Sequence, residues 1–319
     1  MKILTRNETA EFLAAHDNYI ILTHIRPDGD TIGCAAALCR GLRKLGKTAH
    51  ILENKGVSRH FLWLHEGLTT DEVKDTDCVV SVDVASPGML HDDFKPLLGK
   101  IALRIDHHAS ATSFTDCELV DAQSASCAEV IYDVLCLLGV EMDADIAEAV
   151  YVGTSTYTGC FRYANTTAHT FETAAACSRA GARIYQLNMD LFETNTLARL
   201  RMQGWIVDNM KLLRGGTMCV CAIPRATEQA MGVTGDDMDN ISSFPRTVAG
   251  VCMASTLREA ENGDIKLSVR AIPGFDATKV AARFGGGGHK GAAGATIRLP
   301  LAEAAAALEQ AMVAQDNSR

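Results

Sequence analysis

The first half of the chain alternates short apolar runs, rich in β-branched residues, with segments of helical periodicity. The expected strands and helices are, in chain order, residues 19–24 (YIILTH), 33–45, 48–53, 77–84, 100–105 and 128–138. Apolar strands separated by helices are typical of a parallel sheet with both faces covered. We therefore predict an α/β fold here, and we expect residues 146–153 to lead into a turn rich in glycine and threonine.

The pattern changes in the second half, near Gly215 and Gly216. Residues 186–213 contain few helix breakers and predict one long connecting helix. Beyond it we expect strands over 217–223, 247–255, 265–271 and 295–299, a helix ending near 284 and a helix over 301–314. Because 319 residues exceed the usual size of one domain, we predict an N-terminal domain (1–185), a connecting helix (186–214) and a smaller α/β domain (215–319).

Composition and cysteine usage indicate a cytoplasmic protein. Hydrophobic residues make up 47% of the chain, and no apolar run approaches the roughly 20 residues that cross a bilayer. The first residues include acidic side chains where a signal peptide has its apolar stretch. The 11 cysteines form no C-x-x-C pair, so we expect reduced core thiols rather than disulfides or a structural zinc site.

The charge distribution limits the partners that the chain can bind. The net charge is −9, and beyond residue 215 ten Lys and Arg residues face eleven acidic ones, so the N-terminal part carries most of the negative charge. Long duplex nucleic acids need a basic face, which this balance argues against. Small phosphorylated substrates remain compatible, because a bound metal ion inverts the local charge. The sequence does not determine the oligomeric state and permits a homodimer.

Ionisable residues gather at the ends of three predicted strands. They are His24, Asp28 and Asp30 after the first strand, Asp83 at the end of VVSVD, and Asp106, His107 and His108 after ALRI. The carboxyl ends of parallel strands meet at one edge of a sheet, where ligands bind. A single aspartate after a strand is more often a helix N-cap, and Asp30 is a candidate for that role. Together, carboxylates with a minority of imidazoles and no thiolate favour Mn²⁺, and a bridged pair of ions suits phosphoester hydrolysis.

A second group of residues lies in the run FGGGGHKGAAG, residues 284–294. Its backbone N–H groups could approach a phosphate or a base closely, helped by His289 and Lys290. The alternative is a flexible linker, but the run lies between an apolar helix end and a strand, which favours a binding loop. Arg270, at the end of a predicted strand, and Arg258 are candidate anion partners in the same domain.

These motifs resemble those of the DHH phosphoesterases that carry a C-terminal DHHA1 domain, and within them the stand-alone nanoRNase type. The resemblance covers nearly the whole chain and includes residues 159–165 (GCFRYAN), which are similar to the family's T-G-x-F-R-Y-x-N segment. It implies a metal-binding catalytic DHH domain joined by a long helix to a substrate-binding DHHA1 domain, with the active-site cleft between them. It also implies short single-stranded RNA or small nucleotides, including 3′-phosphoadenosine 5′-phosphate, as substrates.

The resemblance assigns a role to each candidate residue. It implies two Mn²⁺ ions, one bound by His24 and Asp28, the other by Asp30 and His107, with Asp83 bridging both. It implies that His108 acts as an acid or charge stabiliser beside the scissile phosphate and that Asp106 supports the site. The far end of the substrate would be held by Arg270, Gly286, Gly287, Gly288, His289 and Lys290.

The chain departs from the family pattern at Tyr157. The family has T-D-T-G where this chain has Thr156-Tyr157-Thr158-Gly159, so a carboxylate ligand of the second metal is missing. Three interpretations stay open. The first is an Mn²⁺-dependent phosphodiesterase that releases 5′-mononucleotides from short RNA. The second is a hydrolase of linear dinucleotides (pApA or pGpG) or of 3′-phosphoadenosine 5′-phosphate, and the third is a nucleotide-binding protein weakened in catalysis by Tyr157.

Overall fold

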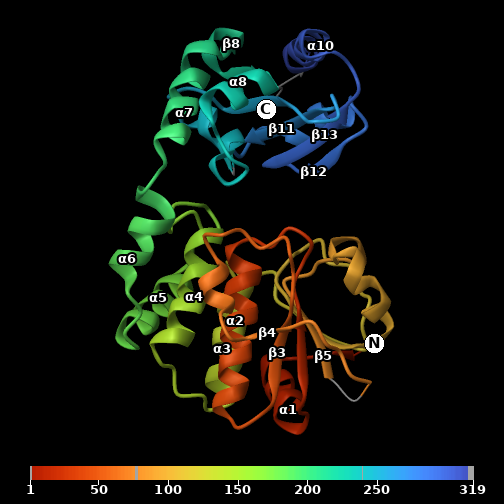
Figure 1. Cartoon of the computed structure of the whole chain (residues 1–319), viewed down its shortest axis with the longest axis vertical. Helices are drawn as coiled ribbons and strands as arrows, with labels where there is room; N and C mark the ends of the chain where they lie inside the picture. Colours follow the sequence, from red (N-terminus) through yellow and green to blue (C-terminus); the bar gives the residue numbers. More distant parts are fainter. Residues whose placement is uncertain (1, 76–77, 239, 315–319) are drawn as a thin grey trace. The chain divides into compact units, whose positions relative to one another are not determined.

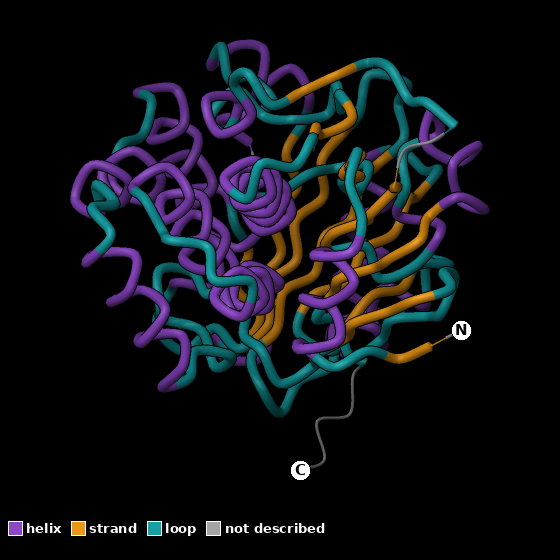
Figure 2. Tube along the Cα trace, turned by 90° about the horizontal axis from the view of Figure 1, so that it is seen from below, coloured by secondary structure: helices purple, strands orange, loops and turns teal. Residues whose placement is uncertain are grey.

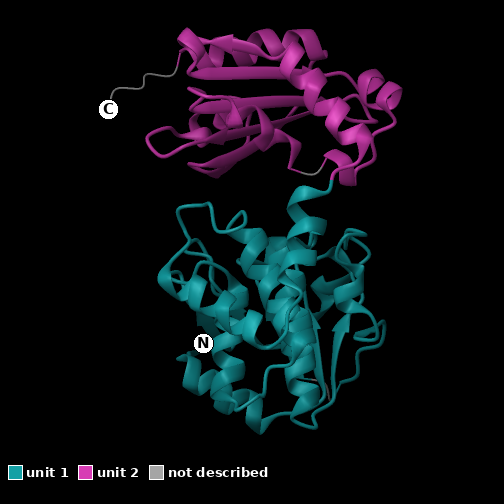
Figure 3. Cartoon of the chain, turned by 90° about the vertical axis from the view of Figure 1, so that its left-hand side faces the viewer, with its two compact units in different colours: residues 1–194 teal, residues 195–319 magenta. Residues whose placement is uncertain are grey.

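A parallel sheet forms the centre of the first of two units, residues 1–194 and 195–319 (Figure 3). The computed structural model describes residues 2–75, 78–238 and 240–314. Within these residues the sheet has seven strands in the order β1-β7-β6-β5-β2-β3-β4, and all neighbours are parallel. The strands are β1 Lys2–Ile3, β2 Tyr19–Leu22, β3 Ala49–Leu52, β4 Thr69–Thr70, β5 Cys78–Val82, β6 Ile101–Asp106 and β7 Cys117–Val120.

Both faces of this sheet are covered (Figure 2). The helices are α1 Arg6–Ala15, α2 Gly29–Lys44, α3 Cys127–Leu137, α4 Ala144–Tyr157, α5 Ala168–Arg179 and α6 Ile184–Asn188. Helix α2 is buried along most of its length and lies beside α3 and α4 in Figure 1. Side chains that include Ile20 and Val79 point to the other face and pack against Phe94 of the 3₁₀ segment Asp92–Lys100. Coverage of both faces explains why the strands are continuously apolar.

Close contact between α2 and α4 depends on two glycines. A Cβ atom on Gly33 would lie 2.4 Å from the carbonyl oxygen of Ala149 and 2.9 Å from the nitrogen of Gly153. A Cβ atom on Gly153 would lie 2.5 Å from Cβ of Ala128 and 3.1 Å from Oδ1 of Asp30. Small residues on both helices therefore bring α2, α3 and α4 together around Asp30.

The predicted strands 19–24, 48–53 and 100–105 and the helices 33–45 and 128–138 are confirmed to within a few residues. Asp77, the first residue of the predicted strand 77–84, lies outside the described residues. The turn expected after 146–153 begins only at Thr158, because α4 continues to Tyr157. The hydroxyl of Thr156 donates to the carbonyl oxygen of Val152 (2.7 Å), so this residue follows the helix instead of ending it.

The single connecting helix predicted over 186–213 is also wrong. Helix α6 ends at Asn188 and a π-helical turn spans Met189–Glu193. The chain is then extended at Thr194, and a new helix, α7, covers Leu197–Asn209 before strand β8 begins at Lys211. The hydroxyl of Thr196 accepts a hydrogen bond from the N–H of Arg199 (3.0 Å). This N-cap starts α7 as a separate helix. The low number of helix breakers in the sequence did not reveal this local signal.

The second unit is built on a six-stranded sheet in the order β12-β13-β11-β10-β9-β8, counted within its described residues. The strands are β8 Lys211–Leu213, β9 Met218–Ile223, β10 Met253–Glu259, β11 Ile265–Ala271, β12 Gly287–His289 and β13 Ala292–Ile297. The remaining helices are α8 Arg225–Met231, α9 Ala277–Ala282 and α10 Leu301–Val313. Only β9 and β10 pair in parallel, and the other pairs are antiparallel.

Helices pack on both faces of this second sheet. Helices α9 and α10 pack on Leu267 and Val269 of β11, whereas α7 packs on Cys221 and Ile223 of β9 at the opposite face. The strand predicted over 247–255 begins only at Met253, because Gly250 has a left-handed backbone (φ 87°) that interrupts the extended chain. In the described part of the chain, no helix is long and apolar enough to span a bilayer.

We expect Gly33→Ala to destabilise the first unit by at least about 2 kcal/mol, because the added methyl group meets the backbone of α4. The control is Gly204→Ala. Gly204 is an exposed glycine within α7 whose added Cβ would meet no atom within 4 Å. It should raise the stability by about 0.5–1 kcal/mol. Urea denaturation of both variants measures these changes, and equal effects at the two glycines would contradict this account of the packing.

Candidate metal centre

The structure brings the seven candidate residues of the first unit together at the carboxyl ends of three adjacent strands. Strand β5 lies between β2 and β6. His24 follows β2, Asp83 follows β5, and Asp106 closes β6. Asp28 and Asp30 belong to the first turn of α2. The sheet order therefore brings three separate motifs into one cluster.

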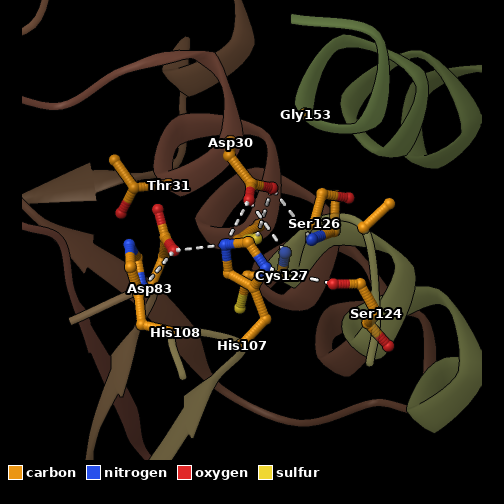
Figure 4. A network of polar contacts seen from close by, with 12 residues as sticks. Asp30, Thr31, Asp83, His107, His108, Ser124, Ser126, Cys127 and Gly153 are labelled. Carbon is orange, nitrogen blue, oxygen red and sulfur yellow. Dashed lines mark hydrogen bonds and ion pairs between the residues drawn. The ribbon is translucent and has the colours of Figure 1, made fainter. Parts of the chain in front are cut away.

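The cluster has two halves that share Asp83. In the first, Nε2 of His24 lies 3.7 Å from Oδ1 of Asp28 and 3.6 Å from Oδ2 of Asp83. In the second, Nε2 of His107 lies 3.6 Å from Oδ2 of Asp30 and 3.7 Å from Oδ1 of Asp83. Figure 4 shows Asp83 and Asp30 pointing toward His107. Each half thus presents an imidazole nitrogen and carboxylate oxygens to a common space.

The backbone conformation and the burial of Asp83 are those expected of a metal ligand. Its backbone is left-handed (φ 58°), which few residues other than glycine, Asn and Asp adopt. Its side chain is 1% exposed, yet neither carboxylate oxygen has a hydrogen-bond partner among the described residues. Nε2 of His107 is also buried and has no hydrogen-bond partner among the described residues. Buried polar atoms are normally satisfied, so these three atoms fit the donor set of a metal ion.

Helix N-termini hold the two aspartates of α2. Oδ1 of Asp28 accepts hydrogen bonds from the N–H groups of Asp30 (3.0 Å) and Thr31 (3.1 Å), so Asp28 is the N-cap of α2. The suggestion that Asp30 is this cap is therefore wrong. Asp30 instead accepts from the first N–H groups of α3, those of Cys127 (2.8 Å) and Ala128 (2.9 Å). Because a helix N-terminus favours negative charge, α3 holds the Asp30 carboxylate in place.

The carboxylates of the cluster repel one another. Burial, together with the neighbouring Asp83 and Asp28 charges, raises the pKa of Asp30 well above its usual value, and burial also raises the pKa of Asp83. Burial alone would lower the pKa of His24, but Asp28 and Asp83 outweigh it and raise that pKa to about 9. A divalent cation bound between these carboxylates would favour their ionised forms and offset their mutual repulsion.

Asp106 and His108 form a pair within the cluster, where Nδ1 of His108 also lies 3.5 Å from Oδ1 of Asp83. Oδ1 of Asp106 accepts from the N–H of His107 (2.8 Å) and lies 2.8 Å from Nδ1 of His108. Burial lowers the pKa of His108, but Asp106, together with the charges of Asp83 and Asp28, outweighs this effect and raises that pKa. With Nδ1 held by Asp106, Nε2 of His108 is the ring nitrogen left to exchange a proton with a ligand.

Sequence reasoning missed Arg104, which supports Asp106 from inside the sheet. Its guanidinium is 1% exposed and lies 2.8 Å from Oε2 of Glu118 and 3.7 Å from Oδ2 of Asp106. It also donates to the carbonyl oxygens of Ala85 (3.2 Å) and Thr112 (3.1 Å). A cation inside the otherwise apolar run IALRI, residues 101–105, is the signal that could have revealed it.

Tyr157 lies on the Asp30–His107 side of the cluster. It is the last residue of α4, and its ring meets the His107 ring edge-on, with centroids 4.6 Å apart and planes at 78°. Burial and the charges of Asp83, Asp30 and Asp28 raise the pKa of the phenol above its usual value. Tyr157 is therefore neutral near pH 7 and adds no ionised oxygen to the cluster.

The glycine-rich run of the second unit is a β-hairpin and not a loop, because Gly287–His289 form β12 and pair with β13. Cβ atoms on Gly286 and Gly288 would lie 2.1 Å and 2.5 Å from carbonyl oxygens of β13, so hairpin packing alone requires these two glycines. Gly287 has open space, and His289 and the following Lys290 are exposed.

The two arginine candidates of this unit differ. Arg270 lies on β11, opposite Ala292 of β13, and thus beside the hairpin. Arg258 forms a two-pronged ion pair with Glu228 (2.8 and 3.1 Å), which argues against its role as an anion partner.

Comparison with known proteins assigns each unit to a domain family. Residues 18–154 match the DHH family, N-terminal domain, and residues 216–314 match the DHHA1 domain. The bifunctional oligoribonuclease and PAP phosphatase NrnA of Thermus thermophilus is 32% identical over 292 residues, which cover 91% of this chain and 87% of the relative. The chain belongs to the DHH family. The Bacillus subtilis protein of the same description is 27% identical over 92% of this chain and 93% of its own.

Solved structures of more distant proteins share the fold of this DHH protein. An exopolyphosphatase-related protein from Bacteroides fragilis matches with a TM-score of 0.89 at 22% identity, over 97% of this chain and 95% of its own. The exonuclease RecJ bound to manganese matches with a TM-score of 0.56 at 16% identity, over 99% and 96%. The family resemblance and the predicted α/β fold are thus confirmed, and the protein is a hydrolytic enzyme of the DHH phosphoesterase family.

We expect Asp83→Asn to lower the affinity for Mn²⁺ at both halves by at least about 100-fold, since Asp83 is shared by them. Asn also tolerates the left-handed backbone. Without metal the variant should be at least as stable as the unaltered chain, because it loses a buried carboxylate that lacks hydrogen-bond partners. Calorimetric Mn²⁺ titration and thermal unfolding measure the two effects, and the exposed Asp116→Asn is the control. Mn²⁺ binding equal to that of the unaltered chain would show that the shared ligand is another residue.

Proposed function

We propose that this enzyme is an Mn²⁺-dependent phosphodiesterase that hydrolyses short oligoribonucleotides to 5′-mononucleotides and also acts on 3′-phosphoadenosine 5′-phosphate. The observation that carries the proposal is Asp83, a buried carboxylate whose oxygens face one imidazole on each side and lack hydrogen-bond partners within the described residues. The relatives described as oligoribonuclease and PAP phosphatase support the choice of substrate.

The proposed mechanism assigns the chain's own residues to two tasks. His24, Asp28 and Asp83 would hold one ion, and Asp30, His107 and Asp83 the other. Bound divalent ions would activate water and neutralise charge on the phosphoryl group. His108, oriented by Asp106, would give a proton to the leaving oxygen through Nε2.

The second unit would hold the substrate away from the reacting phosphate. Arg270 would contact an anionic oxygen, and His289 would stack on a base. The N–H groups of the open Gly287 and its neighbour Gly288, with the ammonium of Lys290, would contact phosphate. Gly286 is assigned a structural part in this binding, because its close contact with Gly294 sets the shape of the hairpin.

The experiment that tests this function incubates the protein and Mn²⁺ with RNAs of two to ten nucleotides, pApA, pGpG and 3′-phosphoadenosine 5′-phosphate. We expect 5′-mononucleotides from the short RNAs, little cleavage of the longest, and none with the Asp83→Asn variant. Turnover confined to pApA or pGpG would favour a dinucleotide hydrolase instead. Tight binding of all substrates without turnover would favour the nucleotide-binding interpretation.

We further propose that the two halves bind Mn²⁺ unequally. The half at His107 has three protein ligands and a neutral phenol beside it, whereas the family pattern adds a carboxylate at position 157. The ion in this half should therefore be weakly held, and catalysis should need a higher Mn²⁺ concentration to reach its full rate.

We expect Tyr157→Asp to raise the Mn²⁺ content from about one ion to about two per chain at micromolar free Mn²⁺, because it adds an ionised oxygen beside His107. The rate on a short RNA should rise with it. Tyr157→Phe, which keeps the ring and adds no charge, is the control and should leave both values unchanged. Elemental analysis after gel filtration measures the ions. Two ions already present in the unaltered chain would mean that another group replaces the carboxylate.

A further inference from the structure

One short segment between β7 and α3, residues 124–128, supports two side chains of the same half of the cluster. Nδ1 of His107 lies 3.3 Å from the carbonyl oxygen of Ser124 (Figure 4). The first two N–H groups of α3 donate to the Asp30 carboxylate (2.8 and 2.9 Å). The position of this segment therefore determines where both the imidazole and the carboxylate of this half lie.

The carbonyl group of Ser124 also selects the tautomer of the His107 ring. A carbonyl oxygen only accepts hydrogen bonds, so in the neutral ring Nδ1 carries the proton and donates it to Ser124. Nε2, which faces Asp30 and Asp83, then offers its lone pair to a cation. Loss of the group that holds the other nitrogen of a metal-binding histidine typically lowers metal affinity roughly 10–100-fold. The Ser124 carbonyl occupies this position in the half at His107.

Two side chains hold the segment at a single residue, Ala125. Oε2 of Glu129 accepts from the N–H of Ala125 (3.1 Å), and Nδ2 of Asn165 donates to its carbonyl oxygen (3.0 Å). Glu129 is fully buried and Asn165 is half-buried. The N–H of Ala125 and the carbonyl of Ser124 belong to the same peptide group. The Glu129 carboxylate and the His107 ring are therefore joined through one peptide unit.

The chain reaches Asn165 from the end of α4 by a strained turn. Residues 159–161 are all left-handed (φ 59°, 57° and 62°), which is unfavourable for the two of them that carry side chains. The N–H of Cys160 donates to the carbonyl oxygen of Ser155 (2.7 Å) and ties the turn to the helix. Asn165 then contacts Ala125, 40 residues earlier in the chain. The G-C-F-R-Y-A-N motif thus connects α4 to the segment that supports the cluster.

Helix capping alone does not account for these two side chains. Ser126 is the N-cap of α3 and accepts from the N–H of Glu129 (3.3 Å), so Glu129 also stabilises the start of the helix. Asn165 lies outside α3 and takes no part in this cap. Oδ1 of Asn165 and Oε1 of Glu129 are buried and have no hydrogen-bond partner among the described residues. Buried unpaired oxygens destabilise a fold, so stability does not explain an amide and a carboxylate here.

We propose that Asn165 and Glu129 are positioning residues that set the affinity of the His107 half for Mn²⁺ by fixing residues 124–128. The proposal rests on the proposed function for the presence of an ion in this half. Without either side chain the segment is free to move, and the two ligands that it supports lose the geometry that suits an ion. The other half keeps its affinity, because its histidine and its N-cap aspartate are held by the ends of β2 and α2.

The test measures Mn²⁺ binding by calorimetric titration up to millimolar Mn²⁺ in the full chain and in the variants Asn165→Leu and Glu129→Met. Each variant keeps a side chain of similar size and loses its hydrogen bond to Ala125. Each should raise the Kd of the binding step that belongs to the His107 half at least about tenfold and change the other step by no more than about twofold. A His107→Ala variant identifies which step belongs to this half.

The double variant distinguishes one shared support from two independent effects. Because both side chains act through the same segment, its Kd should rise by less than the product of the two single effects. The control is Glu148→Met. Glu148 is a buried glutamate of α4 whose carboxylate binds Arg183 (2.6 and 2.8 Å) instead of the segment. This change removes a charged contact of the same unit and should leave both binding steps unchanged.

The first binding step serves as an internal check, because its retention shows that a variant is folded. Equal loss at both steps, an unchanged His107 step, or purely additive effects in the double variant would overturn the positioning role. A single binding step in the unaltered chain at millimolar Mn²⁺ would overturn it as well. Hydrolysis of RNA together with unchanged Mn²⁺ binding in both single variants overturns the positioning role alone. A chain that binds Mn²⁺ as expected and hydrolyses no RNA overturns the proposed function alone.

Discussion

The arrangement at Asp83 is the constraint on which the catalytic unit depends. A carboxylate at the end of the central strand is buried, and the described residues offer it no hydrogen bond, while an imidazole lies on each side. Such a group is unfavourable in a folded protein unless a cation or a proton offsets its charge. The sheet, the helix termini and the glycine contacts hold the surrounding carboxylates and imidazoles in place around it.

The fold holds the carboxylates of this cluster with a different local interaction for each one. The start of α3 binds Asp30, the start of α2 is capped by Asp28, and a buried arginine stands behind Asp106. Helix N-termini supply partial positive charge without adding a titratable group. The carboxylates can therefore be gathered closely before any metal binds, which limits the rearrangement that binding requires.

Tyr157 shows how one residue can alter the chemistry of the cluster without altering the fold. Its backbone completes α4 as an aspartate would, and its ring packs edge-on against His107. The charge of the second half changes by one unit, while the contacts of α2 with α4 at Gly33 and Gly153 do not involve its side chain. The departure from the family pattern at this position is thus electrostatic and leaves the backbone of α4 intact.

The sequence by itself determined the parallel α/β order, the strand ends that bear His24, Asp83 and Asp106, and the departure at Tyr157, because each is a local pattern of residue types. Only the tertiary structure decided which atoms meet. It moved the helix cap from Asp30 to Asp28, paired Arg258 with Glu228, and turned the glycine run into a hairpin whose Gly286 and Gly288 serve packing. It also placed Arg104 behind Asp106 and divided the connecting segment at Thr194. These features depend on distances between residues far apart in the chain, or on competition between neighbouring caps, and periodicity carries neither kind of information.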